Sequence, residues 1–157
     1  MARAVARDID ISFKQAIEIT RSIRFKDVES AKTYLQRVIE KKEPQRFTRF
    51  TNGLGHKPGM AAGRYPIRAC TAILALVKEA EANAQTRGLG TCKIIHAAAQ
   101  KANKPFHYGR RTRRRMKRAH VEIVLQEKTQ DRKTEAVDKP AKAKKQAKAT
   151  SKEGTDQ

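Results

Sequence analysis

The residues best suited to chemistry in this sequence are arginines gathered in one short run. Residues 110–118 read RRTRRRMKR, and the wider segment from Lys101 to Arg118 holds nine Lys and Arg residues and no acid. Arginine offers phosphate a planar fork and stacks on bases, whereas lysine acts as a point charge. The run therefore predicts contacts with a polyanion, nucleic acid first and an anionic membrane surface second. A solvated charge run or a nuclear-localisation-type cluster stays open as an alternative.

A second basic segment, residues 43–65, combines cations with glycines and prolines. Its only acid is Glu43, and its cations are Arg46, Arg49, Lys57 and Arg64. A stretch of this length without periodicity is normally a functional loop or disordered. Because it also contains Phe47, Phe50 and Tyr65, we expect it to be anchored. We call it the basic loop.

Aromatic and histidine side chains within these segments allow two interpretations each. Phe106 and Tyr108 would need a partner surface as a small core pair, so the basic setting favours base stacking. His56 could contact RNA or hydrogen-bond the loop itself. The histidines have no ligand spacing with Cys70 and Cys92, so we expect no metal. No nucleotide-binding, catalytic or cofactor motif is found.

The overall composition indicates the kind of protein that carries these segments. The chain has 157 residues, a net charge of +20, 38% hydrophobic residues, 5% aromatics and no Trp. This predicts one domain, residues 1–128, with a small aliphatic core. The Lys/Ala-rich residues 129–157 are predicted to be a disordered tail. Neither a membrane span nor a secretory signal is expected, and with two cysteines the chain is predicted to be cytosolic.

Three helices and a strand are predicted before the arginine-rich segment. The alternation of Asp8–Ile11 predicts a short strand within residues 2–11. Ser12 and Gln15 form a capping box for a first helix, and Asp27 is the expected N-cap of a second. Pro66 opens a third helix, which ends at Arg87 and Gly88. The predicted buried faces are Phe13, Ala16, Ile17 and Thr20; Val28, Ala31, Leu35 and Val38; and Ile67, Cys70, Leu74 and Val77, a stripe that Ile73, Ala80 and Ala84 widen.

Residues 92–128 are predicted to form one antiparallel hairpin. Both ends are strand-like, most clearly at Val121, Ile123 and Leu125. The midpoint falls at residue 110, beside Gly109, a residue suited to the positive φ of a tight turn. Arms of about 15 residues would reach roughly 50 Å, well beyond a body whose radius of gyration is about 13 Å. We therefore expect the hairpin to project and to be ordered by an anionic partner.

Several motifs in fixed order resemble one known family. They are RFTRFTNGLGHKPGMAAGRYP (46–66), AEANAQTRGL (80–89), KIIHAAAQK (93–101) and AHVEIVLQE (119–127). Together they resemble the large-subunit ribosomal protein L-twenty-two family in its archaeal–eukaryotic form. The resemblance covers about residues 2–128. It departs from the family pattern after Arg118, where fewer residues precede the last strand.

The resemblance implies an α+β fold, with three helices on a small antiparallel sheet and a long extended hairpin. It implies a non-enzymatic structural constituent of the large subunit, in the cytoplasmic ribosome, that binds rRNA and aids assembly. Neighbouring ribosomal proteins and the nascent polypeptide are the other implied partners, with no homo-oligomer and no cofactor. The expected rRNA-binding residues are Arg46, Arg49, Asn52, His56, Lys57, Arg64, Tyr65, Lys101, Lys104, Arg110, Arg111, Arg113, Arg114, Arg115, Lys117 and Arg118. The expected tip, lining the polypeptide exit tunnel, is Phe106, His107, Tyr108 and Gly109.

The residues leave two other functions to compare. An architectural DNA-binding protein could insert a basic β-arm into the minor groove, with Phe106 and Tyr108 as the apolar wedge. That function leaves the basic loop unexplained. An RNA-modifying enzyme would need an acid, a nucleophile or a cofactor motif that the sequence does not offer.

Overall fold

A computed structural model describes residues 1–111 and 113–128 of the protein. The predicted disordered tail, residues 129–157, lies outside the described residues. In chain order the elements are β1 (Ala2–Ile9), α1 (Phe13–Ile23), α2 (Val28–Ile39), β2 (Gln45–Arg46), β3 (Gly63–Arg64), α3 (Ile67–Thr86), β4 (Cys92–Lys101) and β5 (Ala119–Glu127).

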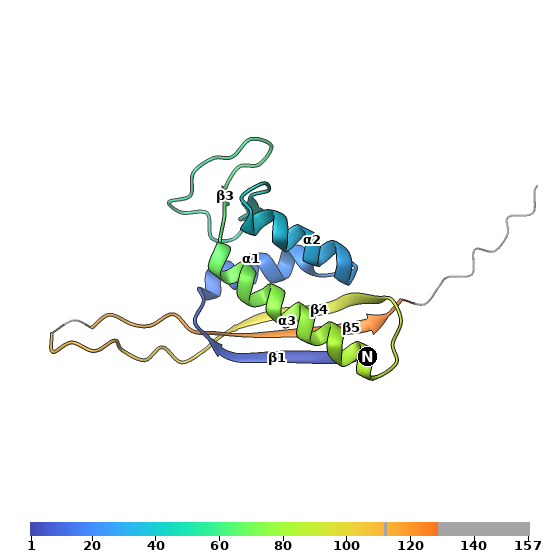
Figure 1. The fold of residues 1–157 in the computed structure, drawn as a ribbon. Helices are drawn as coiled ribbons and strands as arrows, with labels where there is room; N and C mark the ends of the chain where they lie inside the picture. Colours follow the sequence, from blue (N-terminus) through green and yellow to red (C-terminus); the bar gives the residue numbers. More distant parts are fainter. Residues whose placement is uncertain (112, 129–157) are drawn as a thin grey trace, which may run out of the picture.

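The three longer strands form one antiparallel sheet in the order β1-β5-β4, and β2 pairs separately with β3. α1 packs on β4, α3 packs on β1 and β5, and α2 packs on α3. The three helices lie on one face of the sheet, and the hairpin extends beyond it (Figure 1). This confirms the predicted α+β class.

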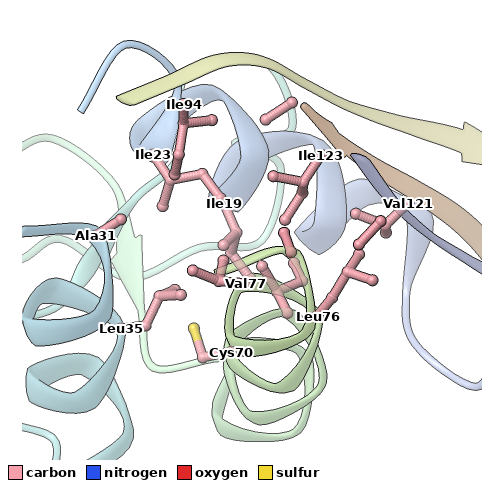
Figure 2. Packing of buried hydrophobic residues seen from close by; sticks show 14 of the residues in the cluster. Ile19, Ile23, Ala31, Leu35, Cys70, Leu76, Val77, Ile94, Val121 and Ile123 are labelled. Atoms are coloured by element: carbon pink, nitrogen blue, oxygen red, sulfur yellow. The ribbon is translucent and has the colours of Figure 1, made fainter. Parts of the chain in front are cut away.

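The core is small and aliphatic, as the composition predicts. Figure 2 shows Ile19 and Ile23 of α1 beside Ile94 of β4, with Leu35 of α2 facing α3. These four side chains are fully buried and belong to one continuous cluster. Aliphatic side chains from every long element thus hold the helices on the sheet, at about 1.5–3 kcal/mol for each large side chain buried.

The two hairpin strands bury their side chains differently. β5 alternates strictly, so that Ala119, Val121, Ile123 and Leu125 are all buried. In β4 a register shift between Ile94 and His96 places both Ile94 and Ala97, three residues apart, on the buried side. A β-bulge of this kind inserts one extra residue and therefore interrupts the alternation.

The strand predicted within residues 2–11 is present, but it begins before the alternation of Asp8–Ile11 that indicated it. β1 spans Ala2–Ile9, and Ile11 lies beyond it. Ala2 and Ala4 are buried, because their small side chains allow α3 to pack closely on this strand. The predicted alternation falls where the strand is irregular, since its register shifts between Ala6 and Ile9 and Asp8 has a φ of 53°.

α1 begins at the predicted residue, but the capping box is wrong. Ser12 precedes the helix in an extended conformation and makes no side-chain capping hydrogen bond. The buried face also differs, because α1 buries Ile19, Ile23 and Glu18 while Ile17 is half-buried. The physical reason is that α1 is covered on two sides, by β4 and by the basic loop.

The buried face of α2 is as predicted, and the buried face of α3 is predicted in part, at Cys70, Ile73, Val77, Ala80 and Ala84. The buried residues of α2 are Val28, Ala31, Leu35 and Val38, after Asp27 at the N-cap. The buried residues of α3 are Ala69, Cys70, Ile73, Leu76, Val77, Ala80 and Ala84. Of the predicted stripe, Ile67 is 38% exposed and Leu74 is half-buried. α3 packs on the sheet and on α2 at once, so its buried surface is broader and rotated relative to a single stripe.

The end of α3 matches the predicted stop. Gly88 has a φ of 68°. Its N–H donates to the Gln85 carbonyl at 2.9 Å, and the Leu89 N–H donates to the Ala84 carbonyl at 3.0 Å. This pair of bonds is the Schellman motif, which satisfies the last carbonyls of the helix and favours glycine.

Candidate nucleic-acid interface

The arm, residues 102–118, continues the hairpin beyond the ends of β4 and β5 (Figure 1). Backbone hydrogen bonds cross it at a few places, the outermost joining the His107 N–H to the Arg114 carbonyl at 2.8 Å. Phe106 lies opposite Arg115 in an isolated bridge. A two-stranded ribbon with so few contacts is marginally stable alone in water. The long extended hairpin predicted for residues 92–128 is present.

The end of the arm is a loop between His107 and Arg114. Gly109 lies in this loop with a φ of 133°, the positive value expected for it. The predicted tight turn is replaced by a wider loop, because the outermost described backbone contact joins His107 to Arg114, about a centre just beyond residue 110. Tyr108 and Gly109 of the predicted tip lie in the end loop. Phe106 and His107 lie on the paired part of the arm.

Among the described residues, the arm has no acidic partner for its positive charge. Of the salt bridges among residues 1–111 and 113–128, none involves an arm residue. Tyr108 is 95% exposed, and the Arg115 guanidinium stacks over the Phe106 ring at 5.0 Å from its centroid. The arm thus presents unneutralised cations and aromatic faces, the groups that bind phosphates and bases.

The basic loop is closed at its base by the pairing of β2 with β3. Phe47 is buried, which confirms that the loop is anchored. Arg64 donates to the Gly53 carbonyl at 2.6 Å and so helps to close the loop. The Lys57 ammonium lies 5.6 Å from the centroid of the Tyr65 ring. Part of the predicted binding set therefore also shapes the loop.

A buried carboxylate of α1 holds the start of the basic loop. Glu18 is 2% exposed. One of its carboxylate oxygens accepts from the Arg49 N–H at 2.8 Å and the Phe50 N–H at 3.4 Å, and the other accepts from the Thr48 hydroxyl at 3.1 Å. Burial raises the pKa of Glu18, but these hydrogen bonds outweigh burial, so the pKa lies below its ordinary value. The carboxylate stays ionised and fixes the direction of the chain at Arg49 and Phe50.

A buried amide completes the attachment of the basic loop. The Gln45 side chain is fully buried. Its amide nitrogen donates to the Ser22 hydroxyl and to the Arg46 carbonyl, both at 2.7 Å, and its oxygen accepts from the Tyr34 hydroxyl at 2.8 Å. Burial raises the pKa of Tyr34 to about 12, so the phenol remains a donor. α1, α2 and the loop are joined by this one amide.

We expect Glu18→Gln to destabilise the protein by about 1–3 kcal/mol, because an amide cannot replace a carboxylate that accepts several hydrogen bonds. A carboxyl group whose pKa is lowered by folding stabilises the fold above its unfolded pKa. That contribution is lost as the pH falls through the folded pKa. Urea unfolding of both proteins should therefore give a difference at pH 7 that shrinks below about pH 4.5. A difference independent of pH would contradict this role of the charge.

The structure does not gather all predicted site residues on one surface. Figure 1 shows the basic loop and the arm as separate projections from the same end of the body. The predicted binding residues are exposed except for Lys57, Tyr65, Lys104 and Arg118, which are half-buried. Arg118 donates to the Asp8 carbonyl at 3.1 Å, so it also ties the arm to β1.

Some residues that shape this region were not predicted from the sequence. Glu18 and Gln45 position the basic loop, and Lys14 lies 5.5 Å from the centroid of the Phe50 ring. One weak signal was available, since an acid at position 18 adjoins the apolar residues Ile17 and Ile19 of a helix. Lys14 offered no signal, because its neighbours come from segments far away in the chain.

Other kinds of site find no support in the described part of the chain. Burial raises the pKa of the Cys70 thiol to about 12, so this cysteine behaves as an apolar core residue. Within residues 1–111 and 113–128, no three His, Cys, Asp or Glu side chains are grouped so that they could hold a metal ion. Over the same residues, no helix combines the length and apolar character needed to cross a bilayer.

Fold and site together define a class: a small α+β protein whose basic loop and basic arm project from one end. The family described as Ribosomal protein L22p/L17e matches residues 4–126. The chain belongs to this family, which confirms the resemblance seen in the sequence motifs.

Curated relatives support the same assignment. The large ribosomal subunit protein uL22 of Methanocella arvoryzae is 41% identical over 136 residues, covering 80% of this chain and 89% of the relative. That of Staphylothermus marinus is 39% identical over 140 residues, covering 81% and 89%. That of Ignicoccus hospitalis is 37% identical over 139 residues, covering 80% and 87%. These three relatives are archaeal proteins, in agreement with the archaeal–eukaryotic form of the family.

Proposed function

We propose that this protein is a structural constituent of the large ribosomal subunit that binds large-subunit rRNA through its arm and basic loop. Family membership and the names of its relatives support the ribosomal part of the proposal. The observation that carries rRNA binding is the arm, whose cations have no acidic partner among the described residues. The protein acts without catalysis, in the ribosome of the cytoplasm.

The proposal also gives the body, the arm and the end loop different roles. The body, with its aliphatic core, is the folded anchor and meets neighbouring ribosomal proteins. The arm lies within rRNA, which supplies the counterions and ordering that the isolated ribbon lacks. The end loop, with Tyr108 95% exposed, lines the polypeptide exit tunnel and meets the nascent chain.

Salt dependence of binding tests the proposal directly. Each phosphate neutralised by Lys or Arg releases counterions, so affinity falls with salt in proportion to the number of contacts. With on the order of eight contacts, a plot of log affinity against log salt concentration should have a slope of about −6 to −7. The measurement is filter binding or fluorescence anisotropy with a large-subunit rRNA fragment. A slope near −1 would contradict binding through these cations.

A further inference from the structure

A groove of about 490 Å³ lies where the root of the arm meets α1 and the basic loop. It joins segments from three distant parts of the chain. Its lining residues are Ser12, Phe13, Lys14, Phe50, Lys101, Lys104, Lys117 and Arg118. Two phenyl rings and five cations thus share one concave surface, and none of its lining residues is acidic. We call it the root groove.

The Phe50 ring is the best candidate for contact with a ligand in this groove. It is half-buried, so part of its surface is open. The Lys14 ammonium and the Arg49 guanidinium each lie 5.5 Å from the ring centroid. Cation–π attraction acts within about 6 Å, so both contacts are near their outer limit. A base that stacks on the ring would displace one of these loosely held cations from the ring face, and that cation would then lie close enough to meet a phosphate of the same nucleotide.

Both sides of the root groove are held in place before any ligand binds. On the loop side, Glu18 accepts from the Arg49 and Phe50 N–H groups. On the arm side, Arg118 donates to the Asp8 carbonyl at 3.1 Å. A site fixed in this way loses little conformational freedom on binding, which favours affinity.

We propose that the root groove binds one unpaired nucleotide of RNA, with the base stacked on Phe50. The nearby phosphates would meet Lys14, Lys104 and Lys117. The inference rests on the proposed function and adds the form of RNA that is bound at this place. A groove of this volume is in the usual range for small ligands, and unstacked bases are bound on aromatic side chains with their phosphates on cations. Duplex RNA keeps its base faces stacked and cannot use the ring.

The test uses the full chain carrying Phe106→Leu and Tyr108→Leu, so that exposed aromatics of the arm do not contribute. The probe is a single-stranded RNA dodecamer with a central 2-aminopurine, whose fluorescence is quenched by stacking; an RNA duplex of equal length is the second probe. Adding Phe50→Leu should weaken single-strand binding about tenfold and abolish the quenching on binding, because the base loses the aromatic ring on which it stacks. Duplex binding should change less than twofold. Phe50→Tyr should keep both properties of the single-strand complex.

Phe25→Leu is the matched control, since Phe25 is 63% exposed and lines a different groove beside Asp27 and Glu29. It should leave single-strand binding unchanged. A second variant, Lys14→Gln with Lys104→Gln, keeps the aromatic ring and should make the single-strand salt slope shallower by about 1.4. If Phe50→Leu lowers the thermal stability, the salt slope of the lysine variant is the measurement that tests binding in the root groove.

Failure of this inference differs from failure of the proposed function. If duplex binding stays salt-dependent while Phe50→Leu leaves single-strand affinity and quenching intact, the root groove does not bind a nucleotide. If an acidic peptide binds in the root groove and neither RNA probe competes with it there, the inference is overturned in the same way. If the protein carrying an intact arm binds neither RNA, the proposed function itself is wrong.

Discussion

Replacing Arg113, Arg114 and Arg115 together with glutamine should weaken binding to large-subunit rRNA roughly 100-fold at about 0.15 M salt. The slope of log affinity against log salt concentration should become shallower by about 2–3, because about three phosphate contacts are lost. The body should keep its stability within about 0.5 kcal/mol, since these side chains are exposed and make no salt bridge within the described part of the chain. Anisotropy titrations and urea unfolding measure the two quantities separately.

In cells the same variant should be folded but poorly incorporated into large subunits. Loss of several charge-assisted phosphate bonds at once removes what orders the arm. Sucrose gradients should then show precursor particles or subunits that lack the protein. Normal incorporation of this variant, or unfolding of its isolated body, would contradict the division into an anchoring body and an RNA-ordered arm.

Two control variants separate the effect of net charge from the effects of where the charge lies and of the guanidinium geometry. Arg37, Lys41 and Lys42 are exposed and lie at the end of α2, away from the arm, so their joint replacement by glutamine removes the same charge. Binding to rRNA should fall far less than in the arm variant. Lysine at positions 113, 114 and 115 retains the charge and should keep the salt slope, while some affinity is lost with the planar guanidinium fork.

Ile73→Ala should cost about 2–5 kcal/mol of folding stability, the largest effect that we expect from a single core substitution. Ile73 is fully buried in α3, within the cluster that joins the helices to the sheet. Removing its outer atoms leaves a cavity that close packing cannot fill. For a body of this size the melting temperature should fall by roughly 8–18 °C. Differential scanning calorimetry gives the shift.

Leu74→Ala, one position along the same helix, is the matched control. Leu74 is half-buried, so its truncation removes less buried apolar area and should cost clearly less. The rRNA affinity of the folded fraction should be unchanged in both variants. Equal losses of stability at positions 73 and 74 would show that α3 presents a different face to the core.

The sequence predicted elements well where local pattern and burial agree. In α2 the predicted residues Val28, Ala31, Leu35 and Val38 are the buried ones, because one side of the helix faces the core. The hairpin was predicted from two strand-like segments about a basic centre, and β4 pairs with β5 over those residues. Which of the proposed residues contact rRNA, and which line the tunnel, stays a prediction.

The predictions failed where an element is covered on more than one side. Ser12 and Gln15 fit a capping box by type and spacing, yet the Ser12 side chain makes no capping bond. In α3 the predicted face included Ile67 and Leu74 and lacked Ala69 and Leu76, since periodicity cannot give the exact orientation of a helix that packs on both a sheet and a helix. The bulge in β4 is likewise absent from the sequence pattern, since Ile94, Ile95 and Ala97 are all apolar and only the pairing with β5 shows where the register shifts.

The charge of this protein, its acid-free arm, its aliphatic character and its family follow from residue types and their order along the chain, so no knowledge of the packing is needed to predict them. The tertiary structure alone decided that Glu18 holds the basic loop and that Phe50 shares a groove with Lys104. Such neighbours are tens of residues apart, and their approach is fixed by the packing of α1 on β4 rather than by any local pattern. Composition therefore indicates a polyanion as the ligand, while packing decides where an individual nucleotide could be held.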